Sequence, residues 1–244
     1  MPKDVGENIQ RLKMWQKKFD GDSFVYDYHL IWDQNNDLGG YKSANILFED
    51  MKNLDKLGIN GMISCQVQRA FYPTGLSMYG MAAALWDKTT EFETVATNYF
   101  NDLFSVHGKK MQDYFKTLSD LLDPPYLRKE KDVVSEDSVK QFSKVRGVVD
   151  EMAAFISDAL GKESDPCRKK TWQSLVIHGK LCNLMADVLI ERANGGDIDA
   201  IKAKWEIAKD YITRSEAEVH DLFDVWYFIK VMCRFLGIKE NQYA

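Results

Sequence analysis

The feature that most constrains this chain is a strand–helix–strand order in its first third. Residues 23–30 (SFVYDYHL) are rich in aromatic and β-branched side chains, which predicts a short strand. Residues 41–57 carry apolar side chains at helical spacing, and Gly58 follows where a helix-capping glycine belongs. A second strand is predicted over residues 59–66 (INGMISCQ). The order indicates two parallel strands, which cannot bury themselves.

Beyond residue 87 almost every signal is helical. Capping boxes are predicted at Thr90 and Ser215, and helix starts at Asp165 and Asp197. Apolar stripes at helical spacing predict an antiparallel helical bundle over about residues 135–240. The stripes begin at Val139, Trp172, Ile201 and Leu222. Before them, a proline pair at 124–125 and a charged run at 128–132 (RKEKD) indicate a hinge.

Composition excludes several classes of protein. A net charge of -5 argues against general nucleic-acid binding, and the sequence holds no apolar run of about 20 residues that would span a membrane. The four cysteines and four histidines are scattered, so we expect reduced thiols and no metal site. Phosphate-loop and dinucleotide motifs are missing, so we expect no cofactor. The first residues lack an apolar signal core, and the chain as written is expected to be cytoplasmic, although a parent protein is compatible with export.

Candidate binding residues follow the two predicted strands. Ligands meet parallel sheets at the carboxyl ends of the strands, and polar groups combined with aromatic rings suit a sugar. This rule selects eight residues: Asp27, His29, Trp32 and Asp33 after the first strand, and Gln66, Gln68, Arg69 and Tyr72 after the second. The alternative is structural: Asp27 and His29 pair with neighbouring backbone groups, and Trp32 lies in the core.

Catalytic chemistry is less evident than binding chemistry. Glycoside cleavage needs two carboxyl groups about 5 to 9.5 Å apart. Asp27 and Asp33 are the candidates for such a pair, but both follow the same strand. No G-x-S-x-G nucleophile motif is present, and His178 and His220 fit amphipathic helices as surface or core residues. We therefore assign no catalytic residue.

Three segments carry a resemblance to a known family. Residues 26–33 (YDYHLIWD), 58–73 (GINGMISCQVQRAFYP) and 80–87 (GMAAALWD) resemble the C-terminal part of a bacterial glycoside-hydrolase-like family that is catalogued as a domain of unknown function. The barrel of that family is similar to those of family-twenty hexosaminidases and α-glucuronidases. Where the hexosaminidases carry substrate-holding Trp and Glu residues on the last strand, this chain has Gln66 and Gln68.

The resemblance implies a fold of the α/β plus all-α class. The two strands would be the seventh and eighth of a (β/α)₈ barrel. Residues 1–122 would then form a partial barrel segment, and residues 123–244 a C-terminal helical bundle domain. Carbohydrate is the implied partner, together with either the missing N-terminal part of the barrel or further copies of the chain.

Two functions remain open at this point. In the first, the chain is the C-terminal segment of a carbohydrate-active protein, supplies sugar contacts, and lacks the catalytic carboxylates, so that alone it is inactive. In the second, it is a non-catalytic helical interaction module whose two strands dock on another chain. Unpaired strand edges invite such docking, and we expect the isolated chain to be an oligomer or poorly stable.

Overall fold

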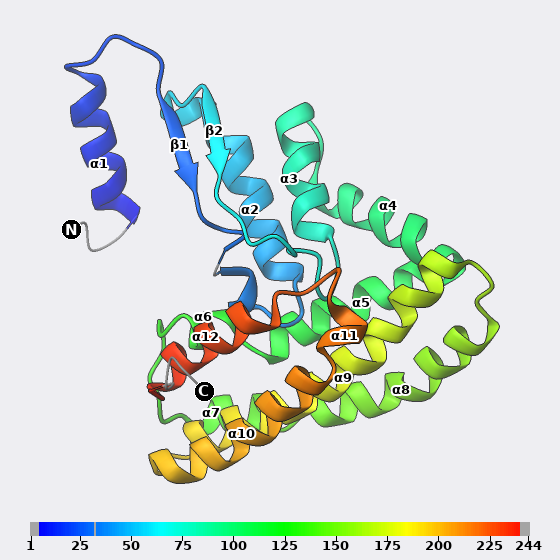
Figure 1. Ribbon diagram of the computed structural model, residues 1–244. Helices are drawn as coiled ribbons and strands as arrows, with labels where there is room; N and C mark the ends of the chain where they lie inside the picture. The colour runs from blue at the N-terminus through cyan, green and yellow to red at the C-terminus, as the bar shows by residue number, and fades with distance from the viewer. Residues whose placement is uncertain (1–4, 32, 240–244) are drawn as a thin grey trace.

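The computed structural model describes residues 5–31 and 33–239. Helices account for 70% of it, and the described residues contain two short strands. The protein is therefore mainly α-helical (Figure 1). The expected fold class, a partial (β/α) barrel followed by a helical bundle, is wrong.

The strands β1 (Phe24–Asp27) and β2 (Gly61–Ser64) pair in parallel, as the strand–helix–strand order predicts. Phe24 lies opposite Gly61, and Asp27 opposite Ser64. Both strands are shorter than expected. The carboxylate of Asp27 accepts the backbone N–H of His29 at 3.2 Å, and a turn follows, so β1 ends there.

The crossover between the strands is α2 (Tyr41–Asn53) followed by a 3₁₀ turn, η2 (Asp55–Leu57). Gly58 ends it with a φ of 67°, which confirms the capping glycine. Before α2 lies another 3₁₀ turn, η1 (Asp33–Asn36). The carboxylate of Asp37 fixes the start of α2, because it accepts backbone N–H groups from Gly39, Gly40 and Ser43.

One face of the sheet stays open. Alternation places Phe24, Tyr26 and Ile63 on the same face, and these side chains are 65%, 51% and 49% exposed. The helix α1 (Val5–Gln16) lies beside the strands in Figure 1 and buries none of its residues. The Gln16 amide at its end donates a hydrogen bond of 2.7 Å to the Leu57 carbonyl.

Helices make up the rest of the chain. They are α3 (Leu76–Trp86), α4 (Phe92–Phe104), α5 (Gly108–Leu121), α6 (Pro124–Leu127), α7 (Glu136–Phe142), α8 (Val145–Lys162), α9 (Pro166–Ala193), α10 (Ile198–Arg214), α11 (Glu216–Val219) and α12 (Val225–Leu236), with a 3₁₀ turn η3 (Ser105–His107) after α4. One apolar cluster runs through them from Leu30 to Leu236. The predicted hinge prolines open α6, and Pro124 is buried.

The barrel expectation fails for a physical reason. Each strand pairs over four residues, and among the described residues no third strand continues the sheet. Instead the helices pack on one another in a shared core, α8 against α9, α9 against α10, and α5 against α8. The domain boundary between residues 122 and 123 remains a prediction.

Most of the predicted helix signals have structural counterparts. The side chains of Asp165 and Asp197 cap α9 and α10 by accepting backbone N–H groups at 2.8 Å. The capping boxes at Thr90 and Ser215 are not formed, because α4 begins after Glu91 and neither α4 nor α11 has a side-chain cap bond. Each of the four stripes contributes buried side chains, but Trp226 of the last one is exposed.

Candidate functional site

A histidine held between two carboxylates lies just beyond β1. His29 Nδ1–H donates to the Asp27 carboxylate, and His29 Nε2 lies 3.1 Å from Asp50 Oδ2 of α2. Asp27 is buried, whereas Asp50 is exposed. The hydrogen bond to Asp27, followed by that to Asp50, raises the pKa of His29 to about 10. At neutral pH the ring is therefore a cation whose two N–H groups are both occupied.

Beside this histidine is a pocket of about 230 Å³. It lies at the carboxyl end of β1, where the sequence places the binding site. Seven polar side chains and three apolar ones line it: His29, Asp33, Gln34, Ser43, Ser77, Arg128 and Glu130, with Leu30, Ile46 and Leu47. Its size admits one small ligand, since pockets for drug-sized molecules begin at about 300 Å³.

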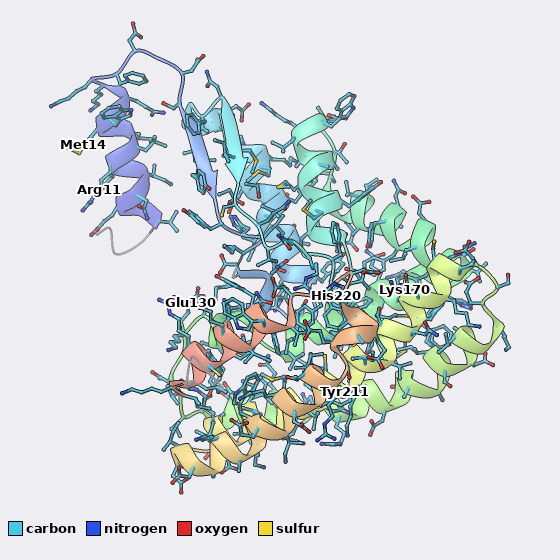
Figure 2. The ribbon with its side chains drawn as sticks, viewed as in Figure 1. Arg11, Met14, Glu130, Lys170, Tyr211 and His220 are labelled. Carbon is cyan, nitrogen blue, oxygen red and sulfur yellow. The ribbon has the colours of Figure 1, made fainter. Side chains whose placement is uncertain are left out.

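Two carboxyl groups of this pocket differ in their surroundings. Burial raises the pKa of Asp33, although the charges of His29 and Arg128 oppose the effect. Glu130 accepts two hydrogen bonds from Arg128, at 2.8 and 3.3 Å, and this pair raises the pKa of the guanidinium. Figure 2 labels Glu130 near α6, on the side of the molecule where α12 lies. The pocket thus offers donors and acceptors close together.

Ser43, one of the lining residues, carries an unsatisfied hydroxyl. Its Oγ is buried and has no hydrogen-bond partner among the described residues, although its backbone N–H donates to Asp37. Buried polar atoms are nearly always hydrogen-bonded, and an exception calls for a ligand, an ion or a water. A hydroxyl that both donates and accepts is suited to another hydroxyl.

The structure separates the predicted site residues. His29 and Asp33 line the pocket, and the Asp27 carboxylate accepts a hydrogen bond from His29. Gln66 and Gln68 are exposed beyond β2, outside the pocket. Tyr72 is buried and stacks on Phe223 at 4.3 Å. Trp32 lies outside the described residues.

Arg69 is held by the C-terminal helices rather than by the pocket. Its guanidinium hydrogen-bonds the ring of His220 at 2.9 Å and lies 3.7 Å from Asp224 and 4.0 Å from Glu216. The backbone beside it is also tied to this region, because Phe71 N–H donates to the carbonyl of Leu222. These contacts give Arg69 a structural role between α11 and α12 and the segment after β2.

Sequence reasoning missed the other half of the pocket. Ser43 and Ser77 come from the first turns of α2 and α3, and Arg128 and Glu130 from the charged run that was interpreted as a hinge marker. The run itself was the available signal, because it stands between a proline pair, of which Pro124 is buried, and the next helix.

Histidine and metal chemistry elsewhere in the described residues gives no further site. His178 is fully buried and bonds the Leu38 carbonyl, so it is a satisfied core residue. Within residues 5–31 and 33–239 no group of three His, Cys, Asp or Glu side chains is arranged to hold a metal ion. In the same ranges, none of the helices combines the length and apolarity needed to cross a bilayer.

Comparison with known proteins adds no relative. No family model, curated protein or solved structure matches the chain. The resemblance to a glycoside-hydrolase-like family therefore rests on the sequence segments alone.

Proposed function

We propose that the chain is a carbohydrate-binding segment that holds one sugar residue in the pocket beyond β1. It supplies contacts and not the hydrolytic step, which belongs to residues outside this chain. The observation that carries the proposal is a pocket lined by both polar and apolar side chains, one of which, Ser43, has a buried and unpartnered hydroxyl.

The lining matches the two sides of a sugar ring. Carboxylate, amide and guanidinium groups hydrogen-bond ring hydroxyls, and Asp33, Gln34 and Arg128 provide one of each. Leu30 and Leu47 form an apolar wall for the C–H side. Asp27 does not line the pocket, so it is not paired there with Asp33 as acid and nucleophile.

The experiment is titration of the chain with a panel of neutral monosaccharides, followed by nuclear magnetic resonance. We expect at least one sugar to shift pocket resonances. Ser43→Ala should bind that sugar about fivefold more weakly, because one hydrogen bond contributes about 1 kcal/mol. Its stability should be unchanged, since the hydroxyl bonds nothing within the described protein.

Ser64→Ala is the matched control. Ser64 Oγ is also buried and unpartnered, but Ser64 does not line the pocket, so its removal should leave sugar binding unchanged. Failure of every sugar to bind at tens of millimolar, or equal affinity in the wild type and Ser43→Ala, would refute the proposal.

The open sheet favours a second candidate function, the interaction module. A two-stranded sheet with an exposed aromatic face is marginal by itself, and its unpaired edges are templates for a further strand. The partner is then a β-strand of another polypeptide, which a second copy can provide. Light scattering should show an oligomer that Ile63→Lys, on the exposed face, converts to monomer. A stable wild-type monomer would count against this candidate.

A further inference from the structure

A second hollow of about 560 Å³ adjoins the pocket beyond β1 and shares Asp33, Arg128 and Glu130 with it. We call it the basic groove. Its walls are η1, the segment after α6, and α12, with these lining residues: Asp33, Asn36, Leu127, Arg128, Lys129, Glu130, Tyr227, Lys230, Val231, Arg234 and Phe235.

The basic groove is positively charged in an otherwise acidic protein. It contains four cationic side chains against two carboxylates, a formal excess of two positive charges, whereas the whole chain carries -5. Arg128 is already neutralised by Glu130. Within the part of the chain that the structure describes, Lys129, Lys230 and Arg234 form no ion pair with a carboxylate.

Three of these cations lie close together on and beside α12. Lys230 and Arg234 are four residues apart on α12, where like charges repel. Both lie towards the carboxyl end of the helix, where positive charge is favoured, and the Lys230 ammonium lies 5.0 Å from the centre of the Trp226 ring. The Lys129 ammonium approaches the same helix and donates to the Arg234 carbonyl at 3.3 Å. Three positive side chains thus surround one hollow whose remaining carboxyl group, Asp33, also lies near the charges of His29 and Arg128.

We propose that the basic groove binds the phosphate dianion of a phosphorylated sugar whose ring occupies the Ser43 pocket. The excess of two positive charges matches a phosphate monoester, which carries nearly two negative charges at neutral pH. An Arg fork and two Lys ammonium groups are common phosphate ligands. The sugar part of the ligand rests on the proposed function, whereas the phosphate contact rests on the groove alone.

The test uses inorganic phosphate, glucose, glucose 1-phosphate, glucose 6-phosphate and mannose 6-phosphate as probes, titrated calorimetrically at low salt. We expect inorganic phosphate to bind and at least one sugar phosphate to bind more tightly. The variant Lys230→Gln/Arg234→Gln should bind inorganic phosphate and the sugar phosphate more weakly. The affinity should fall at least about tenfold for each charge-assisted hydrogen bond that is lost. The control Lys180→Gln/Lys202→Gln makes the same charge change at exposed positions of α9 and α10 and should bind like the wild type.

Several results would overturn this inference. One is no phosphate binding, and another is equal weakening in both double variants. A sugar phosphate that binds no more tightly than phosphate, while the groove variant still loses phosphate, overturns only the sugar part of the ligand. Failure of the proposed function is distinguishable from these. In that case Ser43→Ala leaves the affinity for every sugar phosphate unchanged, while the groove variant still loses inorganic phosphate.

Discussion

The buried histidine of α9 makes the stability of this protein sensitive to acid. His178 donates from Nε2 to the Leu38 carbonyl at 2.6 Å. The Cys182 sulfur lies 3.4 Å from Nε2 and 4.0 Å from Nδ1, and Nδ1 has no oxygen partner among the described residues. An imidazolium would therefore hold a second N–H without an oxygen acceptor. Burial lowers the pKa of His178 to about 4, although the hydrogen bond to the Leu38 carbonyl acts to raise this pKa.

The sign of the effect follows from proton uptake. Between about pH 6.5 and pH 4 the unfolded chain binds a proton at His178 that the folded chain does not, so stability is lost as pH falls. Each pH unit in this window costs about 1.4 kcal/mol. From pH 7 to pH 4.5 the histidine should therefore remove about 2.5 kcal/mol of unfolding free energy.

The assay is urea unfolding of the wild type and His178→Gln at both pH values. Glutamine keeps an N–H donor for Leu38 and cannot titrate, so it isolates the histidine from the carboxylates that also respond to acid. We expect the wild type to lose about 2.5 kcal/mol more than the variant over this range. Equal losses in the two proteins would refute the reasoning.

Three further predictions follow from burial and charge. Trp205→Ala should cost about 3 to 5 kcal/mol of unfolding free energy because Trp205 is fully buried, whereas Trp226→Ala, at 63% exposure, should cost less than about 1 kcal/mol by thermal or urea unfolding. Asp37→Asn should destabilise by at least about 2 kcal/mol, because its carboxylate accepts four hydrogen bonds, and the exposed Asp199→Asn should not. The imidazole ¹⁵N shifts of His29 should titrate near pH 10, and a value near 6.5 would contradict its pairing with two carboxylates.

Local structure was predictable because it depends on neighbours in the sequence. The parallel pair and Gly58 follow from residue type and spacing alone, and the burial of Trp172 and Trp205 from helical periodicity. The number of strands in the sheet does not follow in this way. Aromatic residues such as Phe24 and Tyr26 look like barrel-lining residues in sequence, yet they face outward on a two-stranded sheet.

The candidate site was half predictable for the same reason. The carboxyl-end rule selected His29 and Asp33, which lie a few residues from β1. It could not select Arg128, because Arg128 lies about a hundred residues further along the chain. Only the packing of the helices brings it to the pocket. The same rule selected the residues after β2, but Tyr72 turns into the core.

The weak packing of the first helix, α1, has a consequence for the local unfolding of the protein. With 12 residues and no buried side chain, α1 gains almost nothing from tertiary packing, and a helix of this length is marginal in water by itself. Its folding equilibrium is therefore nearly independent of the core. Fraying of this arm would uncover the Leu57–Gly58 corner at the amino end of β2 and leave the pocket beyond β1 unchanged.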